Sequence, residues 1–301
     1  MKLLNKKIIL IILIFISISL SIYLLAYKLT NETIQSSFNN QIKISQNNID
    51  FTIKQFNKTK FDLLHSLVNN EDVKKFILTQ NDTELKKLFL TFASSNKLIM
   101  QMRLLNLNGN EIFRLDKIKD KYIFQDENSF QNKGHRGYFK SFLKLKKNEL
   151  GISKLSLNVE NNKIEKPFKS TIRIAMPIFL DKKEKAILVI NYNMNSFIKA
   201  LFSSTTFNLY LIDKDEYFIY HPKEELSWTK YKDNRTVVSE YFSKDKLEKL
   251  VFKNIDLWNN EYKIIYENKQ AASLNFFINK TSDIGVLIFL ASLFLVLPFI
   301  Y

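Results

Sequence analysis

The sequence contains no cysteine, and it has little glycine, proline or histidine. Of its 301 residues, 5 are Gly, 4 are Pro and 3 are His. Without cysteine the chain has no disulfide framework, no thiol nucleophile, no iron–sulfur cluster and no zinc site built on thiolates. So few glycines and prolines argue against a fibrous or linker-rich protein. We therefore expect one or two folded domains with no cofactor and no metal site.

Recognisable catalytic motifs are also missing from the sequence. It has no G-x-S-x-G nucleophile turn, no H-E-x-x-H metal motif and no glycine-rich phosphate loop. Carboxylates are plentiful, but none stands in a recognisable catalytic pair. We expect that the chain is not an enzyme, and an enzyme acting outside the membrane is the weakest of the alternatives.

The charge balance is strongly basic. Lys and Arg number 45 against 30 Asp and Glu, which gives a net charge of +15. The lysines are scattered, without an arginine stripe or a basic tail, so we expect no nucleic-acid partner. The favoured interpretation of this excess of basic residues is a compositional bias, and the alternative is attraction for anions.

A long uncharged segment lies near the N-terminus, over residues 8–27. A helix of this length rises about 30 Å, the thickness of a bilayer core. Signal peptides have a shorter apolar region of about 7–15 residues and a small-residue cleavage site, which this segment lacks. Lysines precede it, so the positive-inside rule places residues 1–7 in the cytoplasm and residues 28–283 in the periplasm or outside. The sequence predicts an uncleaved transmembrane helix.

A second uncharged segment covers residues 284–301, where the sequence stops. Its length is at the lower limit for a membrane span, and a buried core helix is the alternative. We expect a second transmembrane helix, in a receptor truncated before its output module. Both spans together predict a protein of the inner (cytoplasmic) membrane.

Residues 28–283 predict a folded extracytoplasmic α+β region. From 29 to about 90 there is no glycine or proline, and apolar residues recur at helical spacing. We predict a long helix followed by shorter ones near 71–79 and 82–94, within a helical part at 28–95. After this helical part, the predicted elements follow the order strand, turn, strand, helix and further strands, and this order occurs twice. The repetition predicts two tandem antiparallel-sheet modules, at 96–203 and 204–283.

Single elements are predicted from turn signals and alternating patterns. Asn108-Gly109 is a strong hairpin signal between two strands. The further predicted strands are 151–159, 170–180, 186–193, 207–213, 217–221, 254–258, 261–267 and 272–279. The further predicted helices are 136–145, 194–202 and 237–252.

Four segments carry a family resemblance. They are RLLNLNGNEIFR at 103–114, NKGHRGYF at 132–139, ISKLSLNVE at 152–160 and AILVINY at 186–192. In this order and spacing the chain resembles the double Cache (tandem PDC-type) extracytoplasmic sensor domain of bacterial transmembrane receptors. The resemblance covers roughly residues 30–280.

The resemblance implies two PAS-like modules on a long helix, of which the membrane-distal one, 96–203, binds a small-molecule ligand. It also implies a homodimer formed through the long N-terminal helix. Output modules in the family are histidine kinases, diguanylate cyclases or chemotaxis transducers. Amino-acid-binding members carry an aspartate near the strand where this chain has Asn191 and Tyr192, which argues against an amino acid as ligand.

Arg136 is the first candidate for a ligand contact, because a guanidinium offers a planar fork to a carboxylate. Beside it, Tyr138 and Phe139 are expected to wall a pocket. Arg173 alternates with apolar neighbours and is expected either in this pocket or in solvent. Weaker candidates are Tyr122 and Asn191.

These residues also have structural interpretations. Arg136 could pair with a carboxylate at a helix start while the two aromatic rings pack in the core. Arg103 and Arg114 lie on facing hairpin strands, where structural ion pairs are the expected role.

The sequence thus predicts the sensing region of a membrane receptor for a small metabolite, with the arginines favouring an anion. The alternative is a non-catalytic module that binds a periplasmic protein or a separate kinase subunit. A first module filled by its own side chains would favour that alternative.

Overall fold

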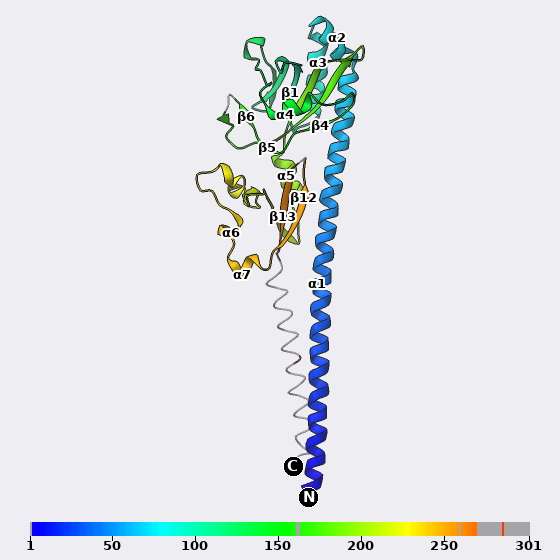
Figure 1. Ribbon diagram of the computed structural model, residues 1–301, viewed down its shortest axis with the longest axis vertical. Helices are drawn as coiled ribbons and strands as arrows, with labels where there is room; N and C mark the ends of the chain where they lie inside the picture. The colour runs from blue at the N-terminus through cyan, green and yellow to red at the C-terminus, as the bar shows by residue number, and fades with distance from the viewer. Residues whose placement is uncertain (1, 161–162, 259, 270–284, 286–301) are drawn as a thin grey trace. The chain divides into compact units, whose positions relative to one another are not determined.

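The computed structural model describes residues 2–160, 163–258, 260–269 and 285 (Figure 1). The predicted strand at 272–279 and the predicted second span at 284–301, apart from residue 285, lie outside the described residues. The helices are α1 (Lys2–Asn69), α2 (Glu71–Thr79), α3 (Thr83–Ser95), α4 (Gly137–Phe142), α5 (Asn195–Leu201), α6 (Val238–Tyr241) and α7 (Lys244–Leu247). Short 3₁₀ turns are η1 (Glu127–Ser129), η2 (Glu224–Leu226) and η3 (Thr229–Tyr231).

Antiparallel sheets make up the rest of the described fold. The strands are β1 (Ile99–Asn106), β2 (Glu111–Ile118), β3 (Lys121–Phe124), β4 (Gly151–Ile152), β5 (Ser156–Leu157), β6 (Val159–Glu160), β7 (Lys163–Ile164), β8 (Ser170–Leu180), β9 (Lys183–Asn193), β10 (Phe207–Ile212), β11 (Phe218–Tyr220), β12 (Val251–Asp256) and β13 (Glu261–Asn268). A long N-terminal helix followed by antiparallel sheets confirms the predicted α+β class. The chain divides into two compact units, residues 1–48, 204–208 and 266–301, and residues 49–203 and 209–265.

The first part of α1 exposes a continuous series of large apolar side chains. Between Leu10 and Leu29 these side chains are 42–63% exposed. The described helix contains an 18-residue window of mean hydropathy 1.8, none of it buried. Water disfavours so much contiguous apolar surface. Length and composition therefore make this segment a candidate membrane span.

Helices α2 and α3 begin and end near the predicted residues, and local signals fix the ends of α2. Asn70 caps α2, with its Oδ1 accepting the amide of Asp72 at 2.8 Å. Gln80 ends the helix in the left-handed conformation, at φ 60°. Helix α3 then buries Phe89 and its neighbours on one face.

The larger sheet has seven strands in the order β3-β2-β1-β9-β8-β4, with β5 also paired to β8. The predicted Asn108-Gly109 hairpin joins β1 to β2, and Gly109 takes φ 82°, which glycine adopts without strain. The edge strand β3 was not predicted. Its four residues are too few to show an alternating pattern.

The two faces of this sheet are covered differently. On one face, Phe113 packs edge-on against Phe76 of α2 and Phe89 of α3, with ring centroids 5.5 and 5.2 Å apart. On the other face, the rings of α4, Phe139 and Phe142, cover an apolar patch of strand residues: Leu105, Ala175, Ile187 and Val189. Helix α4 covers only part of that second face, and the rest carries polar residues.

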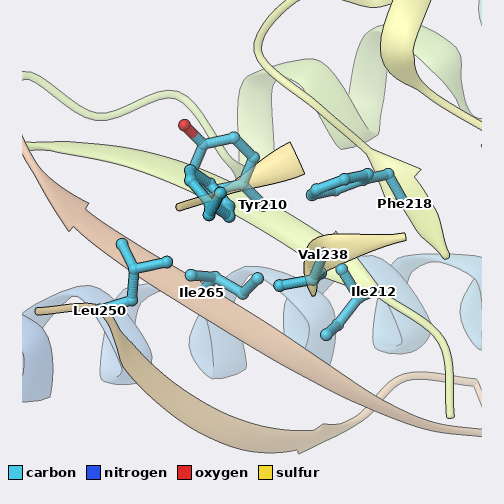
Figure 2. Packing of buried hydrophobic residues seen from close by; sticks show 7 residues of the cluster. Tyr210, Ile212, Phe218, Val238, Leu250 and Ile265 are labelled. Carbon is cyan, nitrogen blue, oxygen red and sulfur yellow. The ribbon is translucent and has the colours of Figure 1, made fainter. Parts of the chain in front are cut away.

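The smaller sheet has four strands in the order β11-β10-β13-β12. Its core combines strand residues with side chains from the following turns, as Figure 2 shows: Tyr210, Ile212, Phe218, Val238, Leu250 and Ile265. Phe242 completes the cluster.

The predicted helix at 237–252 is wrong. Two single turns, α6 and α7, stand there instead, and β12 already begins at Val251. Phe242 breaks the helix with an extended backbone, φ −103° and ψ 137°. Val238, Phe242 and Leu250 have helical spacing, but only Val238 and Phe242 belong to one turn, and Leu250 enters the core of the smaller sheet after α7.

Candidate ligand-binding pocket

The part of the larger sheet that α4 does not cover carries a row of polar residues across four strands. Asp116 pairs with Gln101, Gln101 with Asn191, and Asn191 with Arg173 in the strand register. All four are at most 8% exposed. Buried polar groups need hydrogen-bond partners, so the contacts of this row decide what else it can bind.

A buried network centred on Arg103 holds part of the row. Its Nη1 donates to Glu111 Oε1 at 3.2 Å and its Nη2 to Asn191 Oδ1 at 2.8 Å. The Asn191 amide donates to Gln101 at 2.7 Å, and Gln101 donates to Glu160 at 3.1 Å. Each group fixes the orientation of the next.

Arg114 forms a second buried centre on the neighbouring strand. Its Nη2 lies 2.8 Å from Asp116 Oδ2, and its Nη1 lies 3.4 Å from Glu111 Oε2. Burial and this arginine act in opposite directions on Asp116, and burial prevails, so the pKa of Asp116 is raised. The structural ion pairs predicted for Arg103 and Arg114 are confirmed.

A cavity of about 300 Å³ lies beside this network, and we call it the charged pocket. Among the described residues that line it, four are cationic and one is a carboxylate: Arg103, Lys133, Arg136, Arg173 and Glu160. Tyr138, Asn158 and Tyr231 also face it. All of them belong to the second compact unit.

Two buried atoms at the charged pocket have no hydrogen-bond partner in the described part of the chain. They are Nε of Arg103 and Oδ1 of Asn158, both on side chains that are 2% exposed. An unpaired buried donor or acceptor costs about 1–3 kcal/mol. The fold therefore carries this cost at two side chains that line the charged pocket.

Arg173 is held in place within the charged pocket. Its Nη1 donates to Ser156 Oγ at 3.1 Å, and its Cζ lies 5.0 Å from the centroid of the Tyr138 ring. Burial lowers the pKa of Arg173 to about 10, and the positive charges of Arg103 and Arg136 act in the same direction. A further anion would compensate this charge.

Lys133 is a second strongly perturbed cation. It is 4% exposed, and its Nζ donates to Gln131 Oε1 at 2.6 Å. Burial, with the nearby positive charge of Arg103, lowers the pKa of Lys133 to about 8. This lysine therefore changes charge close to neutral pH.

The structure brings together four of the six predicted site residues. Arg136, Tyr138, Arg173 and Asn191 all line the charged pocket. Arg136 is half-buried at the start of α4, and Arg173 faces the pocket rather than solvent.

The other two predicted residues lie outside the lining of the charged pocket. Phe139 is 1% exposed in the core cluster under α4, because its position three residues before Phe142 puts both rings on the packed face. Tyr122 lies on the edge strand β3, where its hydroxyl donates to the carbonyl of Ile99 at 3.0 Å.

Sequence reasoning missed several lining residues. The alternation of Arg103 with apolar neighbours could have placed it on the pocket face. Lys133 lies in the segment that carried the family resemblance. Asn158 also lies in such a segment, at 152–160. Tyr231 gives no sequence signal, since it reaches the pocket from η3, beyond the second sheet's first hairpin.

A comparison with protein-family models assigns the chain. The model of the bacterial histidine kinase sensor domain matches residues 36–261. The chain belongs to this family. No curated protein matches the sequence.

Solved structures of sensor domains share the fold. The domain of a protein described as a sensory box/GGDEF family member from Vibrio parahaemolyticus is 17% identical, with a TM-score of 0.63 over 78% of this chain and 96% of that one. The extracellular domain of a protein described as histidine kinase vpHK1S-Z8 is 16% identical, with a TM-score of 0.58 over 79% and 98%. The sensory domain of the Campylobacter jejuni chemoreceptor Tlp3 is 15% identical, with a TM-score of 0.55 over 82% and 98%.

These findings confirm the resemblance to Cache-type sensor domains. The chain is thus a sensor domain of bacterial signal transduction. Its described residues contain one candidate membrane helix. At such low identity the solved structures show the fold alone. The ligand has to be argued from the pocket.

Proposed function

We propose that this sensor domain is the extracytoplasmic sensing region of a bacterial transmembrane receptor and binds a small carboxylate anion in the charged pocket. One observation carries the proposal. Four cationic side chains and one carboxylate surround a cavity of about 300 Å³ in the described structure. Burial strengthens the attraction between these cations and an anion, because the local dielectric is lower than that of water.

Glu160, the one carboxylate among the described lining residues of the charged pocket, is already engaged. Glu160 accepts from Gln101 at 3.1 Å and from Asn158 at 3.4 Å, and lies 3.7 Å from Arg114. A ligand ammonium would have only this group to neutralise it while facing four cations. Isoleucine and L-valine are bound in structures of the chemoreceptor Tlp3. The charges here favour a ligand with two carboxylates over an amino acid.

The cavity also bears on the partner-binding alternative. A module without its own ligand would fill this space with side chains, since protein interiors are close-packed. The open volume of the charged pocket supports a small molecule instead.

Transmission follows from the position of α1. Its segment at 8–27 would cross the membrane with the lysines at positions 2, 6 and 7 in the cytoplasm. Its residues Ile53 and Phe56 are buried in the same compact unit as the charged pocket. A ligand would shift the population of two arrangements of this helix in proportion to its differential affinity. Dimerisation through α1 stays a prediction.

Thermal unfolding of the full chain in detergent tests the ligand. Succinate, malate, inorganic phosphate and a set of L-amino acids would be added in turn, because binding to the folded state raises the melting temperature. We expect a shift with a dicarboxylate, lost in Arg136→Ala, whose half-buried side chain can be removed without opening the core. Arg235→Ala, at an exposed arginine, is the matched control.

Two results would contradict the proposal. A shift that survives in Arg136→Ala and in Arg173→Met would place the ligand elsewhere. No shift with any anion would favour the partner-binding alternative.

A further inference from the structure

A second cavity of about 300 Å³ lies apart from the charged pocket, and we call it the junction pocket. The segment before β8 and helix α5 form one wall, through Phe168 and Ile198. Strand β11 and the turn after η2 form the other wall, through Tyr220 and Trp228. All of these residues belong to the second compact unit.

The lining of the junction pocket is mainly apolar. The rings of Phe168, Tyr220 and Trp228 and the imidazole of His221 line it among the described residues. Its charged lining residues are Lys199, Lys232 and Glu224. Small-molecule sites combine such an apolar wall with a few polar groups, and they occur preferentially where domains or modules meet.

Trp228 is held at this pocket in an unusual conformation. Its backbone has φ 58° and ψ 38°, in the left-handed region that bulky residues rarely adopt. The indole Nε1 donates to Ser170 Oγ at 2.8 Å, and the side chain is 6% exposed. Such strain persists only where the surroundings over-determine it. The indole is thus fixed as part of the wall.

The two lysines offer different opportunities to an anion. Lys232 Nζ already donates to the carbonyl of Glu225. Lys199 is exposed on α5 and lines the pocket beside Ile198. An aromatic ring that entered the pocket could therefore place an attached carboxylate near Lys199.

We propose that the junction pocket binds a small arylcarboxylate. The ring lies against Phe168, Tyr220 and Trp228, and the carboxylate pairs with Lys199. This second ligand class differs from that of the charged pocket, so the junction pocket would give the sensor domain an input of its own.

Calorimetric titration of the full chain in detergent tests the proposal, with phenylacetate as the probe. Phenethylamine has the same ring with a protonated aminomethyl group in place of the carboxylate. We expect phenylacetate to bind at least about tenfold more tightly, which corresponds to one charge-assisted hydrogen bond gained instead of a repulsion.

Two variants locate the binding. Ser196→Trp, at an exposed lining position of α5, should fill the cavity and abolish the heat of phenylacetate binding. Lys199→Glu should weaken phenylacetate about tenfold or more. The matched control is Lys185→Glu, at an exposed lysine of β9 outside both cavities, which should bind normally.

Each remaining outcome would overturn the proposal. Phenylacetate binding that is unchanged in Ser196→Trp but lost in Arg173→Met would assign the probe to the charged pocket. Equal affinity for phenethylamine would exclude an anion site. No measurable heat with unmodified protein would mean that the cavity binds no arylcarboxylate.

Discussion

The charged pocket and the junction pocket have similar volumes but are built from different materials. The floor of the charged pocket is a sheet whose polar residues are held by buried ion pairs around Arg103 and Arg114. The walls of the junction pocket are short turns and aromatic rings, joined by one buried hydrogen bond from Trp228 to Ser170. One site is ordered by charge and the other by packing.

Because of this difference, the charged pocket is suited to recognising a ligand, and the junction pocket is suited to coupling a ligand to the contact between the two sheets. Buried charges are expensive to desolvate, and a network that keeps them has its donors oriented before any ligand arrives. The junction pocket instead depends on contacts between segments that belong to different sheets. Its occupancy is therefore the more sensitive to any rearrangement of those segments.

The largest expected effect follows from removing the centre of the charged network. Arg103→Leu removes one of the two cationic partners of the Glu111 carboxylate, which is fully buried. Breaking a buried ion pair on one side costs about 3–5 kcal/mol of unfolding free energy. Chemical or thermal unfolding in detergent measures this loss. Arg235→Leu, at an exposed arginine, should change the free energy by less than about 0.5 kcal/mol.

If the two arginine variants unfolded alike, buried charge would not be what holds the pocket floor.

An intermediate effect is expected from the tryptophan at the junction. The chain has two tryptophans, Trp228 and Trp258, and both are buried with left-handed backbones, φ 58° and 50°. Nε1 of Trp258 has no partner among the described residues, whereas that of Trp228 donates to Ser170. Trp228→Phe should therefore lose about 1–3 kcal/mol more stability than Trp258→Phe.

A double-mutant cycle isolates the hydrogen bond. Trp228→Phe and Ser170→Ala should be non-additive by about 1 kcal/mol, because each removes the same interaction. Additive effects on the melting temperature would show that this bond does not join the two walls of the junction pocket.

Most of the secondary structure was predictable because it depends on local signals. Asn70 and Gln80 fix the ends of α2, and Gly109 supplies the hairpin that only a left-handed residue allows. Where helical spacing arose from residues that enter one core from separate turns, as with Phe242 at the end of α6 and Leu250 after α7, the prediction failed. Periodicity records which residues are buried and not the path between them.

The pocket residues were predictable to the extent that strand alternation decides them. Arg173 faces opposite Ile172 and Ile174, and its register partner Asn191 follows from the pairing of β8 with β9. Tyr231 and Trp228 were not predictable as pocket residues, since they come from turns after β11 whose positions depend on tertiary contacts. Phe139 was placed wrongly because α4 turns its ring into the core.

The smallest expected effect concerns pH and would distinguish the two cavities by titration. Because the pKa of Lys133 lies near 8, its charge is present at pH 7 and largely lost at pH 9. A carboxylate in the charged pocket should therefore bind several-fold more weakly at pH 9, while phenylacetate in the junction pocket, which lacks this lysine, should be unaffected. The unfolded chain keeps its proton until about pH 10.4, so the unfolding free energy should rise over pH 8–10 as affinity falls. Titration of succinate at both pH values measures the first effect, and Lys133→Met should remove the pH dependence. An equal decline for both probes would mean that the pH effect does not come from the charged pocket.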